Sequence, residues 1–272
     1  MHLWHPSYKE HPKSRSHWPM TVLQPVSQLK HSFKEGFVLT THRKALTTGY
    51  WILTGLLFVC GLIMLVVAPA QTAFGPAQRI FYIHLPAAIC TFLAALVLFV
   101  ASVGYLWSRS IKWDDLASSA AKVTVLLCTV VLLTGMIWGK SEWGLWWTWS
   151  PRLTFSLVLW ILYLAYLIIR PMIQSPTRRA TICAVYGLAA FIDVPLVYVS
   201  VKLMPDIHPS SVELEPTMQL TLLVWFIAIP LLTAGLIAAG SSLNTQQRTL
   251  DTLARESNSN TDPANTHTGE PS

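Results

Sequence analysis

The chain has 272 residues, of which 53% are hydrophobic and only 12% are charged. These proportions exclude an ordinary soluble domain, because too few charged residues are present to cover its surface. The formal net charge of +6 does not indicate nucleic-acid binding, since the basic residues are distributed unevenly between the two sides of a series of long apolar runs. We therefore expect a membrane protein with no nucleic-acid partner.

Six apolar runs are long enough to cross a hydrocarbon core, which takes roughly 18–25 helical residues. We predict an all-α polytopic membrane protein with six transmembrane helices, at residues 50–68, 82–107, 119–138, 153–169, 181–201 and 218–240. The polar segments 1–45 and 241–272 lack the apolar residues to fold alone. We expect both to be disordered tails in the cytoplasm. In the sequence they precede and follow a membrane domain at 46–240.

The basic residues predict the orientation of these spans. Fifteen of the 19 Lys and Arg residues fall in or beside the tails and loops on one side, and the other side holds Arg79, Lys140, Arg152 and Lys202. Lys and Arg are retained on the cytoplasmic side of a membrane. The sequence therefore predicts cytoplasmic termini, with loops 69–81, 139–152 and 202–217 on the outer face.

Two histidines lie outside the tails, His84 and His208. His84 begins the second span at its outer end and His208 lies in the last outer loop, so the topology returns both to one face. A histidine at a span end is commonly an interfacial hydrogen-bonding residue. It can also bind a metal, but no cysteine or clear carboxylate pair accompanies these two, as a closed zinc site would usually require.

The loop between the third and fourth spans, "GKSEWGLWWTWSPRLT", holds Trp143, Trp146, Trp147 and Trp149. In a helical turn the first three, spaced i, i+3 and i+4, would form one apolar stripe. One interpretation is an aromatic belt at the level of the lipid headgroups. The density of indoles in a single loop favours another, a flat apolar surface for a planar ligand.

Two imidazoles and an aromatic surface together suit haem, whose iron takes two axial ligands and whose porphyrin needs apolar contact. Arg79 and Arg152 are candidates for the haem propionates, because a guanidinium matches carboxylate geometry. The equal alternative is that both anchor the chain at the membrane surface. Asp193, inside the fifth span, is interpreted as an interior hydrogen-bonding residue. No nucleophile, base and oxyanion group converge, so we do not expect an enzyme.

Three stretches, "RIFYIHLPAA", "TGMIWGKSEWGLWWTWSPRLT" and "VPLVYVSVKLMPDIHPSS", resemble the cytochrome c assembly proteins and, within them, the CcmC (haem exporter protein C) family. The similarity spans about residues 50–240. It implies a multi-pass protein of the bacterial inner membrane that binds haem b (iron protoporphyrin IX) at its periplasmic face, with His84 and His208 as axial ligands. It further implies that haem is presented to a CcmE-like chaperone for cytochrome c maturation, beside a CcmD-like small membrane protein and CcmA- and CcmB-like ABC transporter subunits.

The chain departs from the family pattern at two places. Ser150 follows Trp149 where the family signature has Asp, and "KLMPD" stands where paired tryptophans often precede the second histidine. Two competing hypotheses stay open. A small-solute transporter or channel should have broken helices and inverted repeats. A haem-dependent membrane redox enzyme should retain its haem, whereas a transfer protein should release it.

Overall fold

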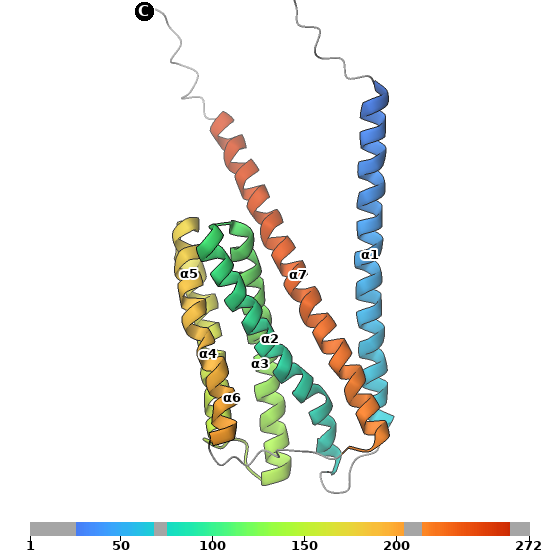
Figure 1. Ribbon diagram of the computed structural model, residues 1–272, viewed down its shortest axis with the longest axis vertical. Coiled ribbons are helices and arrows are strands. Elements are labelled where there is room, and N and C mark those ends of the chain that lie inside the picture. Colours follow the sequence, from blue (N-terminus) through green and yellow to red (C-terminus); the bar gives the residue numbers. More distant parts are fainter. Residues whose placement is uncertain (1–25, 68–74, 204–213, 262–272) are drawn as a thin grey trace, which may run out of the picture. The chain divides into compact units, whose positions relative to one another are not determined.

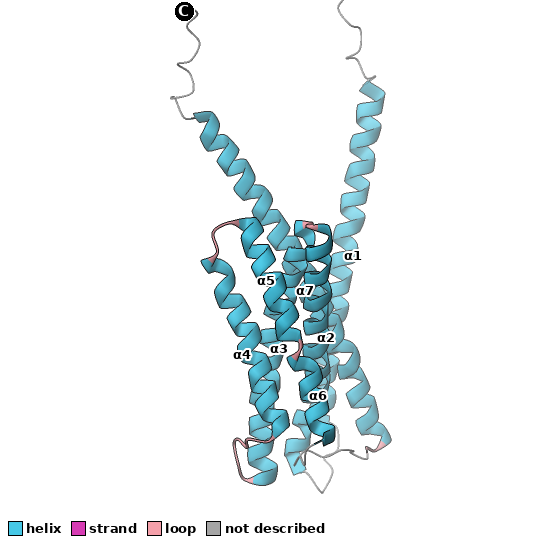
Figure 2. Ribbon diagram, turned by 60° about the vertical axis from the view of Figure 1, so that its left-hand side comes forward, coloured by secondary structure: helices cyan, strands magenta, loops and turns pink. Residues whose placement is uncertain are grey.

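The computed structural model describes residues 26–67, 75–203 and 214–261. Every regular element in these ranges is a helix, as the uniform colour of Figure 2 shows. The elements in chain order (Figure 1) are α1 (Val26–Val67), the short 3-10 helix η1 (Gly75–Gln78), α2 (Arg79–Ser108), α3 (Ile111–Trp143), α4 (Pro151–Met172), α5 (Pro176–Phe191), α6 (Asp193–Leu203) and α7 (Pro216–Thr261). The all-α prediction is confirmed.

Six helical stretches in the described part are long and apolar enough to cross a membrane, with α5 and α6 forming one of them. They are Lys44–Val67, Arg79–Ser108, Ile111–Trp143, Pro151–Met172, Pro176–Ser200 and Pro216–Asn258. Each overlaps one predicted span, so the six-span prediction is confirmed. Large apolar side chains are exposed along them, as lipid contact requires; examples are Leu56, Leu93, Leu126, Ile161, Val185 and Leu223.

Proline sets several of the helix boundaries. α4, α5 and α7 each begin with a proline, which suits the first helical position because its missing N–H would have no partner there. Pro195 has the opposite effect inside the fifth span. It cannot donate to the carbonyl of Phe191, and α5 ends at that residue. The span is therefore broken at Ile192, between α5 and α6.

The centre of the bundle is the contact between α2 and α3, with α5 and α7 also packed against α2. Small residues permit the close approach. A Cβ on Gly104 would lie 2.6 Å from Cδ2 of Trp113, and one on Gly187 would lie 2.5 Å from Cδ2 of Leu98. The buried faces of α2 and α3 are rich in alanine, at Ala94, Ala95, Ala101, Ala117, Ala120 and Ala121.

The helices extend beyond the membrane domain expected at 46–240. α1 already begins at Val26, and α7 continues to Thr261, where we expected a disordered tail from residue 241 onward. Tertiary contacts explain why α7 extends beyond residue 240. Arg248 forms an ion pair with Asp115 of α3, and Thr245 donates a 2.9 Å hydrogen bond to the same carboxylate. The chain divides at Tyr50 into two compact units, and the described site residues all belong to 51–272.

Candidate functional site

His84 lies in the second turn of α2 and is half-buried against α3. Its Nδ1 is 2.9 Å from Oγ1 of Thr134. The next residue of α3 is Gly135, and a Cβ there would lie only 3.3 Å from Cε1 of the His84 ring. The imidazole is therefore in contact with a hydroxyl of α3 and packed closely against that helix.

A cavity of about 350 Å³ lies beside this histidine. Side chains of α2, α3, α4 and α6 surround it, and most of them are apolar. Its polar contributors are His84, Thr91, Cys128, Arg152, Ser156 and Tyr198. An apolar cavity with a few polar groups on its wall is the usual form of a site for a small molecule or cofactor.

The loop between α3 and α4 is not helical, so the predicted tryptophan stripe is wrong. α3 ends at Trp143, and Gly144 follows in the left-handed region with φ +74°. Glycine adopts this conformation without a Cβ penalty and commonly terminates a helix. Trp146 and Trp147 therefore lie in an irregular segment and do not continue the face of α3 that carries Trp143.

The indoles form two edge-to-face pairs. Trp138 and Trp143 have ring centroids 5.3 Å apart with an interplanar angle of 67°, and Trp147 and Trp149 are 5.8 Å apart at 80°. Trp146 is 59% exposed and Trp149 is 76% exposed, whereas Trp143 and Trp147 are half-buried. The loop thus keeps two rings packed and presents two outward. Trp138, which precedes the loop, lines the cavity beside His84.

The two candidate arginines differ in position. Arg152, in the first turn of α4, lines the cavity together with His84. Arg79, the first residue of α2, is not among the described residues that line it. Ser150 is the residue before α4 and its Oγ is buried without a hydrogen bond to the helix. Only Arg152 therefore joins the histidine around one cavity.

His208, the second predicted axial ligand, lies outside the described residues. Its neighbour in the chain, α6, is described through Leu203, and Val197 and Tyr198 of that helix line the cavity beside His84. Asp193 begins α6 and is 5% exposed. Its interior position is confirmed, but its Oδ2 makes no hydrogen bond to any described residue.

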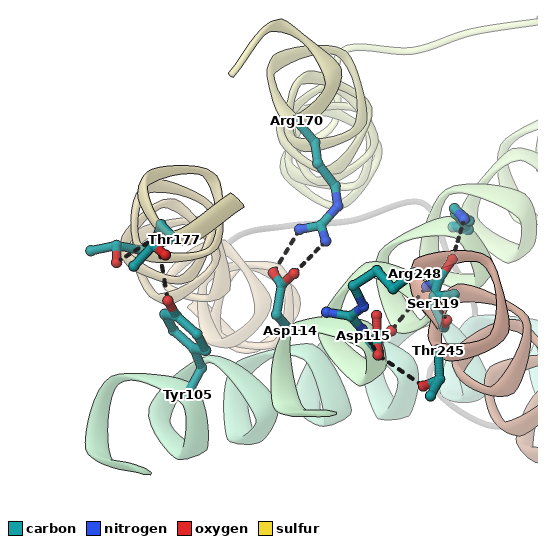
Figure 3. A network of polar contacts seen from close by, with 11 residues as sticks. Tyr105, Asp114, Asp115, Ser119, Arg170, Thr177, Thr245 and Arg248 are labelled. Atoms are coloured by element: carbon teal, nitrogen blue, oxygen red, sulfur yellow. Dashed lines mark hydrogen bonds and ion pairs between the residues drawn. The ribbon is translucent and has the colours of Figure 1, made fainter. Parts of the chain in front are cut away.

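The opposite end of the bundle carries an ion-pair network that the sequence analysis missed (Figure 3). Arg170 of α4 donates to both carboxylate oxygens of Asp114, at 2.7 and 2.5 Å. Asp115, the next residue of α3, pairs with Arg248 and Thr245 of α7. Both arginines entered the sequence prediction only as markers of orientation. The one available signal was the adjacent pair of aspartates shortly before the predicted span 119–138.

Thr134 and Gly135 were also missed as part of the site. Both lie in an apolar run of the third span, and nothing in the sequence relates them to a histidine 50 residues earlier. A hydroxyl followed by glycine near the predicted outer end of a span was the only local signal. The contact depends on the register between α2 and α3, which a single sequence does not contain.

Together the fold and site define a polytopic helical membrane protein with an apolar, histidine-bearing cavity and an aromatic loop at one end of its bundle. The sequence profile of the CcmC family, described as Heme exporter protein C, matches residues 30–259. The chain belongs to this family.

Individual relatives agree with the family match. Heme exporter protein C of Bradyrhizobium diazoefficiens is 33% identical over 186 residues, which are 66% of this chain and 71% of the relative. That of Rhodobacter capsulatus is 33% identical over 120 residues, or 44% and 50% of the two chains. That of Escherichia coli K12 is 31% identical over 150 residues, or 54% and 60%. The chain thus spans less than two thirds of the latter two relatives.

Proposed function

We propose that this protein binds haem b at the cavity beside His84 and passes it to an acceptor protein during cytochrome c maturation. The observation that carries the proposal is the position of His84. Its imidazole stands on the wall of an apolar cavity of about 350 Å³, with Nδ1 in contact with Thr134. A neutral imidazole supplies an axial ligand to iron, and an apolar cavity suits the porphyrin. The names of the relatives, Heme exporter protein C, support the same ligand.

The residues of the site have distinct roles in this proposal. His84 is one axial ligand and His208 is the other. Arg152 contacts a propionate from the cavity wall, because a guanidinium and a carboxylate form paired hydrogen bonds. Arg79, at the start of the same helix as His84, is the candidate for the second propionate.

The tryptophan loop has two functions in the proposal. Trp138 contributes to the cavity wall itself, and the exposed rings of Trp146 and Trp149 offer apolar surface to haem or to the acceptor. Trp143 and Trp147 support those surfaces through their edge-to-face contacts with Trp138 and Trp149. Such contacts hold the rings in place beyond what apolar burial alone provides.

The proposal places the protein in the bacterial inner membrane with its termini in the cytoplasm and the tryptophan loop in the periplasm. The asymmetry of the Lys and Arg residues supports this orientation. The acceptor is a CcmE-like haem chaperone. A CcmD-like protein and CcmA- and CcmB-like ABC subunits complete the complex, so that the chain handles haem and transforms no substrate.

One observation favours the competing hypothesis of a small-solute transporter. The span formed by α5 and α6 is broken at Ile192, beside the buried carboxyl of Asp193. Transporters usually have such breaks in two corresponding halves, with facing polar groups. The other five spans of the described part run as single helices. The haem proposal therefore accounts for more of the site.

The proposal is tested by the absorption spectrum of the protein purified in detergent. We expect a haem Soret band that falls strongly in His84→Ala and in His208→Ala. His42→Ala, which changes a histidine ahead of the first predicted span, is the matched control and should retain the band. If His84→Ala and His208→Ala both keep the wild-type spectrum and haem content, axial ligation by these histidines is wrong.

A further inference from the structure

The direction of the hydrogen bond between His84 and Thr134 determines the tautomer of the imidazole. Nδ1 of the imidazole and Oγ1 of the threonine are 2.9 Å apart, and either atom is able to donate. A neutral imidazole carries its proton on one ring nitrogen and its lone pair on the other. The donor in this bond therefore decides which nitrogen of His84 can bind a metal.

The other contacts of Thr134 identify the donor. Its Oγ1 lies 2.6 Å from the carbonyl oxygen of Val130 and 3.2 Å from that of Val131. A carbonyl oxygen only accepts, and a hydroxyl has a single proton to give. The threonine proton is thus directed at the backbone of α3. With that proton on the backbone, the hydroxyl presents a lone pair toward His84, which an Nδ1-protonated imidazole matches as donor.

Gly135 sets the depth of the same ring. A Cβ at this position would lie 3.3 Å from Cε1 and 3.9 Å from Nδ1 of His84, so an alanine would require the imidazole to shift by a few tenths of an ångström. Thr134 and Gly135 are thus adjacent residues of the surface of α3 against which the imidazole packs. The first fixes the proton and the second lets the ring reach the hydroxyl.

We propose that Thr134 is a positioning residue that holds His84 in the Nδ1-protonated tautomer, so that Nε2 carries the lone pair offered to haem iron. The inference rests on the proposed haem function for its purpose, but not for its geometry. Histidines that bind metals commonly donate their other ring N–H to a nearby acceptor, which fixes the tautomer and raises the basicity of the ligating nitrogen. Here the acceptor is the hydroxyl of Thr134, whose own proton is donated to the backbone carbonyl of Val130.

Three variants separate this role from a general effect of threonine in a helix. Thr134→Val keeps the shape and removes the acceptor, and Thr134→Ser keeps the hydroxyl. Thr124→Val is the matched control. Thr124 is buried in the same helix and donates to the carbonyl of Ala120 at 2.9 Å, which parallels the bond from Thr134 to Val130.

The first measurement uses the full-length protein without haem. The ring nitrogens of ¹⁵N-labelled histidine are observed by NMR at a pH where the imidazole is neutral, and His84→Ala identifies the signals of His84. We expect a protonated Nδ1 and an unprotonated Nε2 in the wild type, Thr134→Ser and Thr124→Val. Thr134→Val should show a mixture of tautomers. A wild-type His84 with its proton on Nε2 overturns the proposal, even if a variant fails to fold.

The second measurement is haem affinity by titration. Thr134→Val should bind haem about 10- to 100-fold more weakly, while Thr134→Ser and Thr124→Val should stay close to the wild type. A Thr134→Val protein with wild-type affinity overturns the positioning role. The two proposals fail separately: a wild type that binds no haem but shows protonated Nδ1 refutes the proposed function alone, and the converse result refutes this inference alone.

Discussion

The two ends of the helical bundle use polar side chains for different purposes. At the Asp114 end, which comprises Asp114, Asp115, Arg170 and Arg248, buried carboxylates meet arginines from two other helices (Figure 3). At the His84 end, which comprises His84, Thr134, the cavity and the loop 144–150, the wall is mostly apolar and two indoles face outward. Asp114 and Thr134 are 20 residues apart on α3, or about 30 Å along the helix.

Residues at the Asp114 end hold the bundle together, whereas we propose that residues at the His84 end contact a ligand. A buried charge is tolerated when a partner compensates it, and breaking such a pair is costly. The Asp114 end satisfies this condition within the chain. At the His84 end, the hydroxyl of Thr134 instead contacts one imidazole beside an apolar cavity. Variants at the two ends should therefore change different properties, stability at one and haem binding at the other.

The largest expected effect is on stability, from Asp114→Ala. The carboxylate side chain is 2% exposed and that of its partner Arg170 is 15% exposed, so the variant leaves a mostly buried guanidinium uncompensated. We expect the free energy of unfolding in detergent to fall by about 3–5 kcal/mol. Asp251→Ala, an exposed aspartate at the same end, is the control. If the two variants were equally stable, the structural role of this ion pair would be contradicted.

A smaller and more local effect is expected from Asp115→Ala. This change removes the partner of Arg248 and the acceptor of Thr245, and should lower the free energy of unfolding by about 1–3 kcal/mol. Amide hydrogen exchange should accelerate in residues 241–258 of α7, and the amides around His84 should exchange as before. Unchanged exchange in 241–258 would mean that the extension of α7 does not depend on this contact.

The smallest effect is expected at the His84 end, from Trp146→Ala and Trp149→Ala. Both rings are mostly exposed, so stability should not change. Each loss should weaken haem binding by about 0.5–1.5 kcal/mol, or up to roughly tenfold, as measured by titration. Trp107→Ala is the matched control, because this indole is 89% exposed at the end of α2 near Asp114. If all three variants behave alike, the loop is an ordinary interfacial belt.

The sequence was sufficient for the spans because lipid exposure requires long apolar runs that can be counted. It also marked His84 and the tryptophan loop as candidates, because both stand out chemically in an apolar chain. It did not reveal the conformation of the loop. The spacing of Trp143, Trp146 and Trp147 fits a helix, but Gly144 adopts positive φ and ends it. A local backbone preference thus overrode a side-chain pattern.

The contacts between helices could not be predicted from a single sequence. His84 meets Thr134 and Asp114 meets Arg170 only because α2, α3 and α4 pack in one register. That register depends on small residues such as Gly104, whose hydrogen side chain admits the ring of Trp113. In the sequence Arg170 served only as a marker of the predicted orientation, and its partner Asp114 did not follow from that. Burial of Asp114 at the same end explains the pairing.

The most direct test of the account is a density map of the full-length protein loaded with haem. We predict planar density at the cavity beside His84, with the iron bonded to Nε2 of that residue and the tryptophan loop against the porphyrin. Haem at the Asp114 end, or iron beyond bonding distance of the His84 ring, would contradict the account.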